Sequence, residues 1–279
     1  MANHDTDQAE GLRRMLERPV PRVFTFFSVL PDDEKGAMLI NLAASLAASE
    51  CNALLVDACM TPSSVLSRFG GFPVATLLDV ANKDRHLDEA LRLVPEGFAL
   101  TRLSRKNVSM VPHPQASLLA QTFDKLASDT DITLVNAELS EYDNLPVPAM
   151  EMGEIVVHMS TTPASIKSAY VLLKDLSDRL GRRPFSLLVT GSSDAEAQMV
   201  FANMSQAANR YLAAQLNFMG SIPADEHIRR ASGQGRTVLE AFPLTGAALA
   251  FRRLASQFSL STLTKSSYGM AIDGASLGV

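Results

Sequence analysis

Short apolar runs alternate along the chain with longer segments whose apolar positions recur every three to four residues. The runs predict buried strands at 22–30, 52–58, 98–103, 131–137, 154–160, 185–191 and 218–223. The periodic segments predict helices at 35–49, 115–128, 163–180, 193–216, 225–232 and 245–257. Strands and helices that alternate in this way form βαβ units. The predicted fold is therefore a single α/β domain, with a doubly wound, mostly parallel sheet and helices on both faces.

The two ends of the chain differ from this repeating pattern. Residues 7–18 predict a short amphipathic helix, with Asp7 as its N-cap and Pro19 at its end. After residue 258 the chain is rich in Ser, Thr and Gly and has no steady period, which predicts a flexible tail. The predicted organisation is a helix and linker at 1–20, the α/β domain at 21–258 and a C-terminal tail at 259–279.

Composition narrows the class of protein. The 279 residues are 47% hydrophobic and 20% charged, which suits one globular domain. The formal net charge of −5 argues against nucleic-acid binding, which depends on clustered Lys and Arg. Cys51 and Cys59 are too few for a disulfide framework, and no apolar run approaches the roughly 18 residues of a membrane span. We therefore expect a cytoplasmic protein.

The histidines offer no metal site, because they are scattered and no two are spaced as i and i+4. His158 falls inside a predicted strand, so we expect it in the core. The sequence therefore predicts no metal ion.

Several short motifs occur in a recognisable order. They are DQAEGLR at 7–13, NLAASLA at 41–47, LLVDA at 54–58 and GSIPADEHIRRA at 220–231. In this order the chain resembles the MinD/ParA group of P-loop ATPases and, within it, the FlhG family of flagellar-number regulators, also called FleN. The resemblance runs from about residue 7 to residue 258. The DQAxxLR helix is its most specific part, because other MinD/ParA proteins generally lack it.

The phosphate-binding loop of that family reads approximately SGKGGVGKT, and this chain departs from it at most positions. Ser28 and Lys35 match the family's serine and P-loop lysine, whereas Leu30 replaces the signature lysine that reaches across the dimer. The other replacements are Val29, Pro31, Asp32 and Glu34 for glycines, Asp33 for valine and Gly36 for the threonine that binds magnesium. Glycine amides form the concave nest that holds phosphate, so this loop predicts weak phosphate binding.

The resemblance points to three further departures outside the loop. Cys59 stands where the family has an acid that positions water, and Asn136 stands where it has the Walker B acid. Thr190 stands where relatives often have an asparagine that contacts adenine. We therefore expect a pseudo-ATPase with no catalytic residues and no cofactor, neither ATP nor magnesium. Vestigial nucleotide positions would remain at Ser28, Lys35 and Asp57.

The same residues also have simpler interpretations. Lys35 would be a solvated lysine in the first turn of a helix, and Asp57 a strand-end cap or a surface acid. Cys51 and Cys59 would be small buried or half-buried residues.

The resemblance also implies partners. In the family, the DQAxxLR helix acts on FlhF, a GTPase related to signal-recognition particles, and completes its GTP hydrolysis. The corresponding positions here are Asp7, Gln8, Ala9, Leu12 and Arg13, with Gln8 implied to position water or phosphate. Further implied partners are a flagellar transcription regulator or proteins of the flagellar switch complex. The expected assembly is a monomer or a nucleotide-independent dimer.

Two alternatives remain open at this point. One is a weak ATPase with a rebuilt loop, whose remnants would be Ser28, Lys35 and Asp57. The other is a MinD-like scaffold in another cell-surface or secretion system. In either case, 245–258 predicts a helix that packs on the domain. The tail predicts weak or no direct membrane binding, so any association with the inner membrane would be peripheral and through partners.

Overall fold

The computed structural model covers most of the predicted domain. It describes residues 22–59, 65, 69, 75–105, 108, 111–139 and 145–268, with the backbone alone for 259–268. The predicted helix at 7–18 lies outside the described residues, and with it Asp7, Gln8, Ala9, Leu12 and Arg13.

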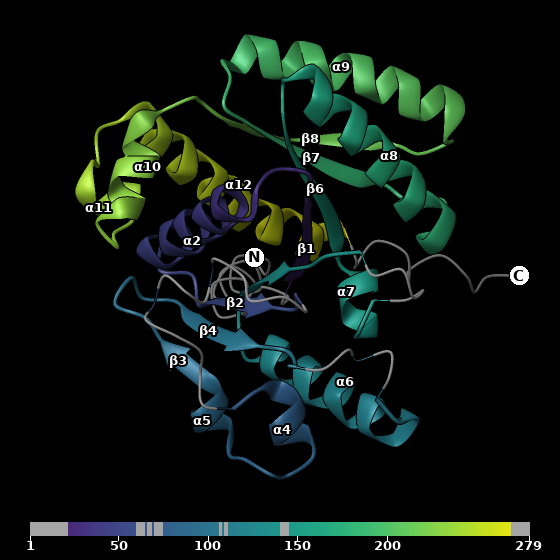
Figure 1. Cartoon of the computed structure of the whole chain (residues 1–279), viewed down its shortest axis with the longest axis vertical. Helices are drawn as coiled ribbons and strands as arrows, with labels where there is room; N and C mark the ends of the chain where they lie inside the picture. The colour runs from purple at the N-terminus through teal and green to yellow at the C-terminus, as the bar shows by residue number, and fades with distance from the viewer. Residues whose placement is uncertain are drawn as a thin grey trace, which may run out of the picture.

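The centre of the molecule is an eight-stranded sheet (Figure 1). Its strands are β1 (Arg22–Ser28), β2 (Ala53–Asp57), β3 (Leu91–Leu93), β4 (Ala99–Arg102), β5 (Ile132–Asn136), β6 (Glu154–Ser160), β7 (Phe185–Thr190) and β8 (Leu216–Ile222). They lie in the order β3-β4-β2-β5-β1-β6-β7-β8, and every neighbouring pair is parallel except β3 with β4. The predicted doubly wound, mostly parallel sheet is confirmed.

Helices cover both faces of the sheet (Figure 1). They are α2 (Asp32–Ala48), α4 (Leu77–Ala81), α5 (Leu87–Ala90), α6 (His113–Ser128), α7 (Pro148–Met152), α8 (Pro163–Leu180), α9 (Asp194–Tyr211), α10 (Glu226–Gly233), α11 (Val238–Ala241) and α12 (Gly246–Tyr268). On one face, α12 packs against α2 and β8, and α10 and α11 lie beside α2. On the other face, α6 contacts α4 and α7, while α8 and α9 cover β6, β7 and β8.

The core is divided by the sheet into two layers, because side chains along a strand point alternately to opposite faces. Phe24 and Phe26 of β1 join the layer formed with α2 and α12. Phe27 joins the layer formed with α6, α8 and α9. The aromatic run of β1 therefore stabilises both halves of the domain.

The strand order also determines where a site can form. The chain runs from β1 towards β2 on one side of the sheet, and from β5 across β1 to β6 and β7 on the other. In open α/β sheets, ligands bind at the carboxyl ends of the strands, where the strand order reverses. In this protein that point is the end of β1, at Ser28.

Several predicted boundaries are wrong. Helix α2 begins at Asp32 rather than Lys35, and α9 ends at Tyr211 rather than at residue 216. The predicted tail boundary at 258 lies inside α12, whose helical backbone continues to Tyr268. Residues 269–279 lie outside the described residues.

The prediction that 245–258 packs on the domain is confirmed. Phe251, Leu254 and Phe258 of α12 are buried, and the Phe258 ring lies 4.4 Å from the Phe24 ring, between centroids. In the described part of the chain, no helix has the length and apolar character needed to cross a bilayer.

Candidate functional site

The connection from β1 to α2 is short and contains no glycine. Val29 and Leu30 form a bend, Pro31 is the N-cap of α2, and the Pro31 carbonyl accepts a hydrogen bond from the Lys35 amide at 3.0 Å. The first turn carries the acids Asp32, Asp33 and Glu34. Carboxylates at this position stabilise the positive end of the helix dipole. The helix therefore begins within the stretch that aligns with the family's glycine-rich loop.

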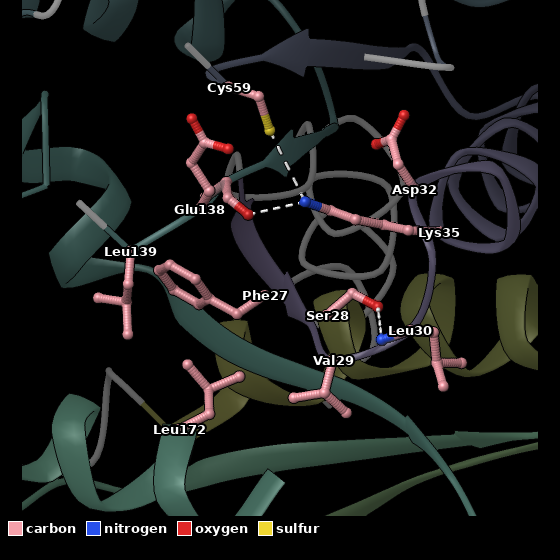
Figure 2. Close-up of a pocket in the computed structure, with 11 residues that line it drawn as sticks. Phe27, Ser28, Val29, Leu30, Asp32, Lys35, Cys59, Glu138, Leu139 and Leu172 are labelled. Carbon is pink, nitrogen blue, oxygen red and sulfur yellow. Dashed lines mark hydrogen bonds between the residues drawn. The ribbon is translucent and has the colours of Figure 1, made fainter. Parts of the chain in front are cut away.

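Lys35 is buried, with 7% of its surface exposed. Its Nζ donates to the Ala137 carbonyl at 2.8 Å and lies 3.7 Å from Cys59 Sγ (Figure 2). The prediction of a solvated lysine is wrong, because the earlier start of α2 turns this side chain towards the ends of β2 and β5. Its ammonium group is held by atoms of the protein itself.

Cys59 lies beside that ammonium group. Its thiol donates to the Asn136 carbonyl at 3.6 Å, and burial raises the pKa of the thiol to about 12. Cys51 is half-buried, and burial raises its pKa to about 12 as well. Both cysteines are thus protonated at neutral pH, and their predicted burial is confirmed.

Asp57 and Asn136 form a buried pair on neighbouring strands. Asn136 Nδ2 donates to Asp57 Oδ1 at 2.8 Å, and neither side chain is exposed. The prediction of a surface acid at Asp57 is wrong, because Asp57 is fully buried at the end of a central strand that lies between β4 and β5. The strand-end position of Asp57 is as predicted.

A hydrogen-bonded chain crosses three central strands at the same edge of the sheet. Ser28 Oγ lies 3.0 Å from His158 Nδ1, and His158 Nε2 lies 3.0 Å from Thr190 Oγ1. Burial, together with the smaller effect of the Lys35 charge, lowers the pKa of His158 to about 3. The imidazole is therefore neutral, and the prediction that His158 belongs to the core is confirmed.

A cavity of about 420 Å³ opens beside these groups (Figure 2). It is lined by Phe27, Ser28, Val29, Leu30, Asp32, Lys35, Cys59, Ala137, Glu138, Leu139 and Leu172. Figure 2 shows Phe27, Val29, Leu139 and Leu172 gathered on one side, with Lys35, Asp32 and Cys59 on the other. The cavity thus has an apolar wall and a charged wall.

The structure brings two of the predicted nucleotide positions, Ser28 and Lys35, to this cavity. Asp57 is not among the lining residues and lies in the sheet, where Asn136 binds it. Sequence reasoning missed Glu138, Leu139 and Leu172. The first two directly follow a predicted strand, and that position could have identified them, whereas no pattern marked Leu172.

The chemistry of this arrangement is restricted. The thiol of Cys59 and the imidazole of His158 are held uncharged, so neither exchanges a proton near neutral pH. The cavity offers hydrogen bonds, the Lys35 ammonium group, the carboxylates of Asp32 and Glu138 and an apolar surface. These groups can bind a ligand.

Solved structures with the same fold define the class of protein. The cell division ATPase MinD of Pyrococcus furiosus matches with a TM-score of 0.62 and 16% identity, over 86% of this chain and 99% of that chain. The ParA family ATPase of Chlorobium tepidum matches with a TM-score of 0.64 and 19% identity, over 85% and 99% respectively. The fold is therefore that of the MinD/ParA group of P-loop ATPases.

A sequence relative defines the family within that class. The antiactivator FleN of Pseudomonas aeruginosa is 31% identical over 222 residues, which are 78% of this chain and 79% of FleN. The chain belongs to the FleN family, as the order of its motifs predicts. No family model matches the chain.

Proposed function

We propose that this protein is a flagellar regulator of the FleN type that acts through protein–protein contacts and has lost ATP hydrolysis. One observation carries the proposal. Lys35 lies in the first turn of α2, which begins at Asp32, and its Nζ donates a hydrogen bond to the Ala137 carbonyl. A P-loop lysine contacts phosphate, so phosphate binding here requires that this buried hydrogen bond be broken.

The start of α2 also disfavours phosphate. A phosphate nest needs successive backbone amides in conformations that glycine adopts easily. Pro31 has no amide hydrogen, and Asp32 presents a carboxylate at the cavity. The negative charge of a nucleotide would therefore be repelled at the helix end that usually attracts it.

Magnesium lacks ligands at the corresponding positions. Gly36 has no hydroxyl, Asn136 is uncharged, and the Asp57 carboxylate accepts a hydrogen bond from Asn136. Magnesium requires oxygen ligands in near-octahedral geometry, supplied by carboxylates, hydroxyls and phosphates. We therefore propose that Mg-ATP is neither held nor hydrolysed.

Activity through partners is compatible with that loss. In the FlhG family the N-terminal helix acts on an FlhF-like GTPase, and this action does not require the regulator's own ATP site. We propose that Asp7, Gln8, Ala9, Leu12 and Arg13 contact such a GTPase and that Gln8 promotes its GTP hydrolysis. The protein would work in the cytoplasm and reach the inner membrane through partners.

Two assays test this proposal with the full chain. Phosphate release from Mg-ATP should stay at the level of a protein-free blank. GTP hydrolysis by the cognate FlhF-like enzyme should rise when the protein is added, and Gln8→Ala should remove the increase. ATP turnover would contradict the proposed loss of ATP hydrolysis. Stimulation of the GTPase that survives Gln8→Ala would contradict the proposed role of Gln8.

A second candidate function is a weak ATP-binding scaffold of the MinD type. The observation that favours it is the cavity itself, because Ser28 and Lys35 still line about 420 Å³ of open space at the end of β1. Isothermal titration with Mg-ATP separates the two candidates, since only the scaffold would show saturable heat.

A further inference from the structure

The cavity at the end of β1 has two walls of different chemistry (Figure 2). Phe27 is fully buried on the apolar wall, and Val29, Leu139 and Leu172 are half-buried there. A volume of about 420 Å³ is within the range of small-molecule pockets. The apolar wall therefore suits a ligand that has an apolar body.

By formal charge, the charged wall carries two carboxylates and one ammonium group. Asp32 and Glu138 line the cavity with Lys35, and Asp57 lies in the adjacent strand. Burial is the largest cause of the raised pKa of Cys59. Among the charges, Lys35 has the largest effect and lowers this pKa, while Asp57, Glu138 and Asp32 raise it. Three carboxylates thus act on Cys59, which lines the cavity, against one ammonium group.

Lys35 does not turn this wall into an anion site. Its Nζ is already bound by the Ala137 carbonyl, whose oxygen reduces the positive potential that a ligand would meet. His158 adds no positive charge, because burial holds its pKa at about 3.

We propose that this cavity binds an amphipathic organic cation, in which one ammonium or guanidinium group is joined to an apolar body. The cation lies towards Asp32 and Glu138, and the body packs on Leu139 and Leu172. The same chemistry is offered by a free amine and by a Lys or Arg side chain that a partner inserts.

A bare metal ion fits the cavity less well. In the part of the chain that the structure describes, no group of three His, Cys, Asp or Glu residues could hold a metal. A metal ion would also leave the apolar wall without a partner. The inference rests on the proposed absence of nucleotide from this cavity, but its test does not use ATP.

Matched probes test the charge preference. We would titrate the full chain with 4-phenylbutylamine, with the neutral 4-phenylbutanol and with the anionic 4-phenylbutyrate, by calorimetry at low salt. A second arm uses the peptide acetyl-Leu-Arg-Leu-amide, which represents a partner's side chain. At least one of the two cationic probes, the amine or the peptide, should bind at least about tenfold more tightly than both the alcohol and the carboxylate. A tenfold difference in Kd corresponds to about 1.4 kcal/mol of binding free energy.

Variants locate the binding to this cavity. Asp32→Asn combined with Glu138→Gln should remove the preference for the cation over the alcohol. Asp33→Asn is the matched control, because Asp33 lies in the same helical turn and does not line the cavity. Leu172→Ala should weaken the binding of the amine and of the alcohol to the same extent. Circular dichroism checks that each variant is folded.

Two results would overturn the inference: tighter binding of the carboxylate than of the amine, or no binding of either cation. Binding of the amine alone identifies a free ligand, and binding of the peptide alone identifies a partner's side chain. Binding that is unchanged in the double variant would place the ligand elsewhere and also overturn the inference. Failure of the proposed function would appear separately, as turnover of Mg-ATP.

Discussion

His158 is the residue where burial most clearly fixes a charge state. Its imidazole lies between Ser28 and Thr190 in the middle of the sheet, and burial lowers its pKa to about 3. The unfolded chain would bind a proton near pH 6.5, whereas the folded chain would not. The stability linked to His158 is therefore fully present above about pH 6.5 and is lost as the pH falls towards 3.

This linkage gives a pH-dependent prediction. Between pH 6 and pH 4, the unfolding free energy should fall by up to about 1.4 kcal/mol per pH unit through His158 alone. His158→Gln should reduce this dependence of the unfolding free energy on pH by up to about 1.4 kcal/mol per pH unit, the contribution of one proton. His113→Gln, at an exposed position, should leave the dependence unchanged. Urea unfolding across this range measures the slope, and equal slopes in all three proteins would refute the assignment.

The pair of Asp57 and Asn136 gives a second prediction at the residue scale. Asn136→Asp would place two carboxyl groups in contact inside the sheet, where both cannot ionise without a large cost. We expect a loss of about 3 kcal/mol in unfolding free energy at pH 7. The loss should grow as the pH rises, because the folded state retains a proton that the unfolded state releases.

The matched control is Asn203→Asp on the exposed face of α9, which makes the same chemical change in contact with water. It should alter stability by less than about 0.5 kcal/mol. Chemical unfolding at pH 5 and pH 8 compares the two variants. An Asn136→Asp protein as stable as the control would show that the pair is not buried in this way.

These contacts could not be read from the sequence. The partners of Lys35, Asp57 and Ser28 lie 102, 79 and 130 residues away along the chain. The resemblance to the FlhG family identified Ser28, Lys35 and Asp57 as a group, because they match positions of its nucleotide motifs. It did not identify the groups that bind them, which are the Ala137 carbonyl for Lys35, the Asn136 side-chain amide for Asp57 and the His158 imidazole for Ser28.

At the scale of elements, the long strands and helices were predictable and the short ones were not. The helices α4, α5, α7 and α11 have four or five residues, too few for a period to appear. The boundary between α9 and β8 was missed because apolar residues continue in helical spacing past Tyr211. In the structure Leu216 pairs with Phe185 in the sheet, and this pairing overrides the local pattern.

The segment 29–36, which aligns with the family's phosphate-binding loop, gives a prediction at this scale. Replacing 29–36 by the family's Gly-Lys-Gly-Gly-Val-Gly-Lys-Thr should not restore ATP hydrolysis. Cys59 and Asn136 would still lack the carboxylates that position water and magnesium in the family. Phosphate release at the level of the unmodified chain is the expected result, and turnover by the loop variant alone would show that the loop was the sole defect.

Helix α12 carries a prediction about packing. Phe258→Ala should cost about 3 kcal/mol of unfolding free energy, because the ring is 4% exposed and packs on Phe24. Leu249→Ala on the same helix should cost less than about 0.5 kcal/mol, since Leu249 is 55% exposed. Denaturant unfolding measures both, and similar costs for the two variants would mean that the apolar face of α12 is not docked as described.

At the scale of the whole molecule, the protein has the fold of the MinD/ParA ATPases and a connection from β1 to α2 that contains no glycine. The fold matches that of solved MinD/ParA ATPases, and the chain belongs to the FleN family. The sequence departs from the family's motifs where β1, β2 and β5 end, at Leu30 and Pro31, at Cys59 and at Asn136. We propose that the protein acts through partners and that the cavity at the end of β1 binds a ligand other than nucleotide.

The most direct test of this account is the melting temperature of the full chain with and without Mg-ATP, with magnesium alone as the control. Nucleotide at about 100 times its Kd would stabilise the fold by about 2.7 kcal/mol, which should raise the melting temperature by at least about 5 °C in a protein of this size. The account predicts no shift at millimolar Mg-ATP. A clear, saturable rise, which Lys35→Ala removes, would contradict it.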